Sequence, residues 1–218
     1  MNLTSPAARR LAAATITCTA IVLPAAALAS PGPAAAARSP ASQAGSARPV
    51  TAYVISGYPG MRTVTPIDAA TNTAGKAIKI GGGASAIAIT PNGKTAYVVL
   101  AAITGAGSLG VVPIQTATNK AGKTIPVGLF PGVIAITPDG KTAYATSQSG
   151  LTPISTATNK PGKTIKGLDG PIAITPDGKT VYAVSSSPGT VTAVSTATNK
   201  PGKAIKVGSY PIAIAITP

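Results

Sequence analysis

Lysines recur at regular places in this sequence, and their type and spacing point to binding chemistry. Some end the phrase Pro-Asn/Asp-Gly-Lys, and the others follow the phrase Thr-Ala-Thr-Asn. Fixed cations in a regular series attract polyanions through long-range electrostatics and counterion release. We therefore predict a polyanion-binding surface made of nine lysines: Lys94, Lys120, Lys123, Lys141, Lys160, Lys163, Lys179, Lys200 and Lys203.

Residues for acid–base or metal chemistry are scarce. The chain has four aspartates, no glutamate and no histidine, and its one cysteine is Cys18. Asp139 and Asp177 occupy turn positions that favour Asp for backbone reasons, and Asp68 is interpreted as a cap at the end of a strand. General acid–base catalysis needs groups that converge on one substrate. We predict no catalytic residue, no metal site and no cofactor.

Two phrases repeat along the chain and indicate a repeat protein. The phrase Thr-Ala-Thr-Asn-Lys-Pro-Gly-Lys or a variant of it occurs four times, at residues 69–76, 116–123, 156–163 and 196–203. Ile-Thr-Pro-Asn/Asp-Gly-Lys-Thr occurs three times, at residues 89–95, 136–142 and 174–180, and its beginning returns at 216–218. A period of about 40–45 residues is typical of one propeller blade.

Within one repeat, alternation and β-branched residues predict four short strands. The first two are Ala-Ile-Ala-Ile-Thr at 86–90 and Thr-Ala-Tyr-Val-Val at 95–99, joined by a Pro-Asn-Gly turn. In an up-down-up-down sheet, both lysine-bearing turns emerge at the same end. We predict an all-β fold, a β-propeller of four-stranded antiparallel blades with about four repeats present. A partial or truncated propeller is one of the possibilities. A solenoid is the alternative, but these hairpin turns favour antiparallel strands.

Several segments resemble a known family. The Thr-Ala-Tyr-Val strand, residues 66–73 (Pro-Ile-Asp-Ala-Ala-Thr-Asn-Thr), residues 123–128 (Lys-Thr-Ile-Pro-Val-Gly) and the Ile-Thr-Pro-Asp-Gly-Lys turn are similar to the YVTN-type β-propeller repeat of surface-layer and secreted bacterial proteins. The resemblance covers about residues 49–218, although the Thr-Asn pair that gives the repeat its name is absent after each Tyr. It implies the fold more than a function, because family members typically have seven blades and mostly unknown activity.

The order of the predicted strands leaves three assemblies open. The repeats begin at a second strand, residues 51–56, and a further first strand is expected at 212–217. That last strand could pair with the first and close a four-bladed ring. The alternatives are a truncated chain or open arc, and a larger ring shared between chains as a homo-oligomer.

The N-terminal residues predict export. Residues 1–29 combine Arg9 and Arg10, an apolar stretch and an Ala-Leu-Ala cleavage site, which together are typical of a secretory signal. Either the general or the twin-arginine route fits, and an uncleaved membrane anchor is the alternative. Residues 30–48 form a predicted disordered Ala/Pro/Ser linker, and the repeats occupy residues 49–218. We expect an extracellular or cell-surface protein with no membrane span after cleavage.

Charge then suggests a role for the exported repeats. Removing Arg9 and Arg10 from the 18 basic residues leaves 16 against 4 acidic residues, a formal net charge of +12. We expect a non-catalytic surface or binding module that contacts an anionic cell-wall polymer, an acidic glycan or nucleic acid by charge. The alternatives are lysines that serve solubility only, a lactonase- or oxidoreductase-type propeller enzyme with its site in the central funnel, and a fragment without independent activity.

Overall fold

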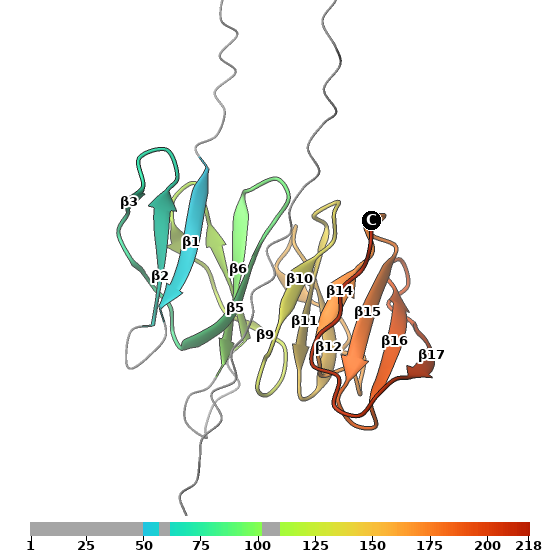
Figure 1. The fold of residues 1–218 in the computed structure, drawn as a ribbon. Coiled ribbons are helices and arrows are strands. Elements are labelled where there is room, and N and C mark those ends of the chain that lie inside the picture. Colours follow the sequence, from blue (N-terminus) through green and yellow to red (C-terminus); the bar gives the residue numbers. More distant parts are fainter. Residues whose placement is uncertain (1–49, 57–61, 102–109) are drawn as a thin grey trace, which may run out of the picture. The chain divides into compact units, whose positions relative to one another are not determined.

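A computed structural model describes residues 50–56, 62–101 and 110–218 (Figure 1). The predicted secretory signal and linker lie outside these residues, so both stay predictions. All regular structure in the described ranges is β-strand, and no helix there is long and apolar enough to cross a membrane.

The described strands form four antiparallel sheets, each made of consecutive strands, which we call blades 1 to 4 (Figure 1). Blade 1 contains β1 (Thr51–Ser56), β2 (Thr63–Asp68), β3 (Thr73–Ala74) and β4 (Ile78–Lys79). Blade 2 contains β5 (Gly83–Ile89), β6 (Thr95–Ala101), β7 (Gly110–Gln115), β8 (Lys120–Ala121) and β9 (Ile125–Pro126). Blade 3 contains β10 (Ile134–Ile136), β11 (Thr142–Ser147), β12 (Gly150–Ser155) and β13 (Lys160–Pro161). Blade 4 contains β14 (Ile172–Ile174), β15 (Thr180–Ser185), β16 (Thr190–Ser195) and β17 (Pro201–Lys206).

The outer strand of a blade is continuous only where the neighbouring strand lacks proline. Pro66, Pro113 and Pro153 stand in the third strands of blades 1 to 3, and their carbonyl oxygens accept hydrogen bonds from Gly75, Gly122 and Gly162. Proline has no N–H to return such a bond, so the ladder breaks there. Blades 1 and 2 therefore have split outer strands, and in blade 3 only β13 and an isolated bridge from Leu151 to Ile165 form. Blade 4 has Ala193 at this position, and its outer strand β17 is six residues long.

The apolar core lies between successive blades. Tyr97, Val99 and Ile125 of blade 2, for example, pack on Ala143 and Ile154 of blade 3. Corresponding clusters join blade 1 to blade 2 and blade 3 to blade 4. The innermost strands also contact one another in chain order, β1 with β5, β5 with β10, and β10 with β14. This arrangement is that of β-propeller blades, which confirms the predicted fold class.

The expected first strand at residues 212–217 is not formed. These residues lie in no strand, and Ile212 is 88% exposed. A strand needs a partner for its backbone groups, and β1, the expected partner, pairs only with β2 among the described strands. Within one chain, this segment therefore does not pair with β1.

Candidate functional site

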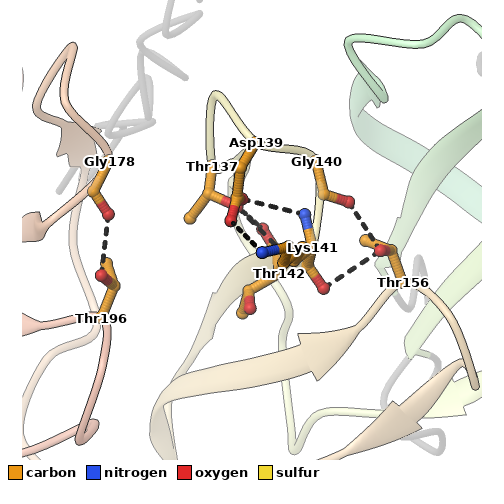
Figure 2. Close-up of polar contacts among 8 residues, drawn as sticks. All are labelled: Thr137, Asp139, Gly140, Lys141, Thr142, Thr156, Gly178 and Thr196. Carbon is orange, nitrogen blue, oxygen red and sulfur yellow. Dashed lines mark hydrogen bonds and ion pairs between the residues drawn. The ribbon is translucent and has the colours of Figure 1, made fainter.

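In blades 2 to 4, the first lysine-bearing turn, which joins the first two strands, is fixed by its own side chains. In blade 3, the Thr137 hydroxyl donates to Asp139 (2.6 Å) and accepts from the Thr142 N–H (3.1 Å), as Figure 2 shows. The Lys141 N–H donates to the same Asp139 oxygen (3.0 Å), and Gly140 has a positive φ of 71°. Asp139 therefore stabilises the turn, as its position in the sequence predicts.

Similar turns occur in blades 2 and 4. Thr175 donates to Asp177 (2.6 Å) in blade 4, and Thr90 donates to Asn92 (2.8 Å) in blade 2. The hydroxyl of Thr175 and the N–H of Lys179 hold the pKa of Asp177 below its usual value. Backbone N–H groups of Thr71 and Ala70 lower the pKa of Asp68 in the same way, which confirms its role as a cap.

The second lysine-bearing turn of a blade is hydrogen-bonded to the first. The Thr156 hydroxyl donates to the Gly140 carbonyl (2.6 Å), and the Thr156 N–H donates to the Lys141 carbonyl (3.0 Å) (Figure 2). Thr116 bonds Gly93 (2.6 Å) and Thr196 bonds Gly178 (2.7 Å) in blades 2 and 4. Both turns of a blade therefore lie at the same end, as expected, and we call this end the turn end.

A tyrosine–asparagine hydrogen bond links the turn ends of successive blades. The Tyr97 hydroxyl of blade 2 donates to Asn159 Oδ1 of blade 3 (2.7 Å). Tyr53 and Tyr144 donate to the corresponding asparagines, Asn119 (2.8 Å) and Asn199 (2.7 Å). From the sequence, the Thr-Ala-Tyr-Val strand and the Thr-Ala-Thr-Asn phrase were treated as separate motifs, and no contact between them was predicted. The signal for the pairing was present, because Tyr and Asn recur once in each repeat.

The same asparagines require an unusual backbone conformation. Asn72, Asn119, Asn159 and Asn199 have φ between 53° and 55°, in the left-handed region. Asn tolerates this region better than most residues. At Asn119, Asn159 and Asn199, the turn and the contact between blades therefore both depend on one residue, and both help to place the lysine that follows it.

The structure separates the nine predicted lysines into two groups, all of them exposed. Six follow the turns at the turn end: Lys94, Lys120, Lys141, Lys160, Lys179 and Lys200. The other three lie three residues farther along the outer edge of each blade: Lys123 between β8 and β9, Lys163 after β13, and Lys203 within β17. Lys123, for example, follows Gly122, whose N–H bonds Pro113 in the middle of β7. We call the first group the turn lysines and the second the rim lysines.

Few of these charges are neutralised. Lys141 pairs with Asp139 and Lys179 with Asp177, each at 3.7 Å, and no other ion pair occurs within the described ranges. The two lysine side chains are 83% and 82% exposed. Exposed ion pairs of this kind contribute about 0–1 kcal/mol to stability. Neither pair therefore prevents its lysine from binding a ligand.

A groove connects the rim of blade 1 with a turn of blade 2. It has a volume of about 620 Å³ and is lined by Lys76, Ala77, Ile78 and Lys79 of blade 1, and by Thr118 and Asn119 of blade 2. Two ammonium groups and an amide are suited to an anionic group. In the described part of the chain, no three His, Cys, Asp or Glu residues lie together as metal ligands.

The turn end therefore combines exposed cations with a rigid backbone. In blades 2 to 4, Thr and Asp or Asn hold the first turn, and a Thr hydroxyl together with a Tyr–Asn bond from the preceding blade holds the second. Burial, and secondarily the Asp139 charge, raise the pKa of Tyr144 to about 12, so its hydroxyl stays a hydrogen-bond donor at neutral pH. Such a surface can bind an extended anion without ordering its own loops first.

Comparison with known proteins supports the fold. No protein-family model matches the chain, and neither does any curated protein sequence. Among solved structures, the chain is similar to the Kuenenia stuttgartiensis hydrazine synthase, with 29% identity, a TM-score of 0.59, and coverage of 68% of this chain and 44% of that one.

Two further solved structures are similar. A functionally unknown protein from Desulfotomaculum acetoxidans has 18% identity, a TM-score of 0.64 and coverage of 76% of this chain and 55% of its own. The WD40 repeats of RRP9 have 15% identity, a TM-score of 0.50 and coverage of 59% and 40%. The chain thus spans about half the length of the structures it matches. WD40 repeats form propeller blades, so these likenesses agree with the fold.

Proposed function

We propose that this chain is an exported, non-catalytic propeller module of the YVTN type that binds a phosphate-bearing cell-wall polymer through its turn end. The fold supports a binding or scaffold role in general, because propeller blades present rigid turns. The resemblance of the repeats to the YVTN family and the signal-like residues 1–29 support the family and the location.

One observation carries the choice of ligand. The turn lysines come in pairs, one from each of two turns that are hydrogen-bonded to each other. In blade 3, for example, Thr156 of the turn that carries Lys160 donates to the backbone carbonyl of Lys141. The Tyr–Asn bonds then join one such pair to the next blade. A polymer with a phosphate in every unit can meet several of these sites at once. Its affinity arises from counterion release and from multivalency.

The test compares two triple variants with the same change in net charge. Lys120→Gln/Lys160→Gln/Lys200→Gln removes turn lysines, and Lys123→Gln/Lys163→Gln/Lys203→Gln removes rim lysines. Binding to poly(glycerol phosphate) is measured by calorimetry at several salt concentrations, with heparin and duplex DNA as comparison ligands. The turn triple should reduce the magnitude of the slope of log K against log salt by about 2–3 if each lysine meets one phosphate. The rim triple should change it little.

Three results would contradict the proposal. Equal losses in the two triples would mean that binding follows net charge rather than the turn end. Affinity independent of salt would exclude an electrostatic contact. Tighter binding of heparin or DNA would assign the turn end to another polyanion.

A further inference from the structure

Each junction between blades joins two different surfaces. The preceding blade presents a tyrosine from its second strand and an apolar residue from its outer strand, such as Tyr97 and Ile125. The following blade receives them with small or branched residues, such as Ala143 and Ile154, and with the asparagine of its turn. We call the first surface the donor face and the second the acceptor face.

The acceptor face of blade 1 is uncovered in the described chain. Val54 is 45% exposed, whereas Val98, the residue at its position in blade 2, is 0% exposed. Ala52 is exposed and Ile67 half-buried, although residues at their positions in the other blades are fully buried. Asn72 has the left-handed conformation of the other three asparagines, but no described tyrosine donates to it.

The donor face of blade 4 is uncovered in the same way. Ile205 is 53% exposed, whereas Ile125 at the same position in blade 2 is 3% exposed. Val207 is 42% exposed, against 3% for Val127. Tyr182 matches the three donor tyrosines in sequence, and its hydroxyl has no acceptor among the described residues.

The free segment after blade 4 matches the strand that blade 1 lacks. Residues 213–217 read Ala-Ile-Ala-Ile-Thr, identical to residues 86–90, most of which lie in β5. In blade 2, β5 pairs with β6 so that Ile87 stands opposite Val98. The same register on β1 would place Ile214 opposite Val54. Added strands of this kind bind through the backbone groups of a free edge.

We propose that two copies of this chain associate head to tail, with the donor face of blade 4 on the acceptor face of blade 1 of the second copy. Tyr182 then donates to Asn72 of the other copy, and residues 212–217 pair with its β1. The occupant is a second copy because both faces are halves of a junction that the chain already makes three times. Such a contact is heterologous, so it closes as a ring or continues to further copies. It does not depend on the proposed function.

The test uses disulfide formation between two singly substituted full chains, each in a Cys18→Ser background. Val54→Cys protein is mixed with Ile214→Cys protein under mild oxidation, and the mixed disulfide is measured by non-reducing electrophoresis. We expect efficient cross-linking, because directly opposite residues bring their Cβ atoms close together. Ala213→Cys is the matched control. Its side chain points to the other side of the strand, so its yield with Val54→Cys should be about tenfold lower.

Two outcomes overturn the proposal. If Val54→Cys gives no mixed disulfide with Ile214→Cys beyond the Ala213→Cys level, the copies do not meet in this register. If the double variant Val54→Cys/Ile214→Cys cross-links only within one chain, the chain closes on itself instead. Sedimentation equilibrium of the unsubstituted chain supplies an independent reading. A monomer across the micromolar range contradicts association, and a species of two or more copies supports it.

Discussion

At the scale of single residues, Asn159 shows how one side chain can meet two demands. Its φ of 55° favours Asn or Gly, and its side-chain oxygen accepts from Tyr97 of the preceding blade. Asn159→Gly keeps the backbone conformation and removes the amide, so it should lower the free energy of unfolding by about 1 kcal/mol. Asn159→Ala also strains the backbone, which adds about 1–2 kcal/mol. Urea unfolding followed by circular dichroism measures both.

The control for this prediction is Asn72→Gly in dilute protein. Asn72 has nearly the same φ, 53°, but no tyrosine donates to it within the described chain. Its replacement by Gly should therefore change stability by a few tenths of a kcal/mol at most. If Asn72→Gly and Asn159→Gly cost the same, the hydrogen bond to Tyr97 contributes nothing measurable, and the asparagines serve only the turn.

At the scale of the strands, the beginning of the third strand depends on a close approach of backbones. Gly150 begins β12, and a Cβ there would fall on the carbonyl oxygen of Ile165, at a φ of 122°. Gly167 also has a positive φ, 76°, but no atom stands where its Cβ would be. Gly150→Ala should therefore cost about 3 kcal/mol or more, from strain and overlap together. Gly167→Ala should cost only about 1 kcal/mol of strain, and thermal unfolding of the two variants compares them. Equal costs would mean that the outer strand moves aside freely.

The strands themselves were largely predictable from the sequence. The Pro-Asp-Gly turns set the hairpins, and alternation of Ile and Ala set the first strands, so β5, β10 and β14 contain residues of the predicted runs. The breaks in the outer strands were not predicted, because they depend on which neighbouring strand the backbone of Pro113 and its equivalents faces. The tyrosine–asparagine pairs were missed for a related reason. They join residues about 60 positions apart, and only the spatial order of blades brings them together.

At the scale of the whole molecule, the sequence predicted the fold but not how the lysines divide between the turn end and the outer edges of the blades. Counting lysines in the second turn grouped Lys120 with Lys123, but the structure places Lys120 in β8 beside the turn and Lys123 in the break between β8 and β9. Three residues correspond to about 10 Å in an extended strand, enough to carry a side chain from the turn end to the rim. The expected strand at 212–217 fails for another reason. A strand depends on its partner's backbone, which the sequence of the segment alone does not supply.

A propeller built from similar blades should be least stable where its junctions end. Stability in repeat proteins is approximately a sum of blade and junction terms, so a blade with one junction should open before a blade with two. Val98 and Ala145 of the inner blades are fully buried, whereas every residue of β17 is exposed. In dilute protein, amide hydrogen exchange followed by mass spectrometry should therefore be fastest in β1 and β17 and slowest in β6 and β11. Uniform exchange rates would show that the described blades open as one cooperative unit. At higher concentration, head-to-tail association should slow exchange in β1 and in residues 212–217 while leaving β6 and β11 unchanged.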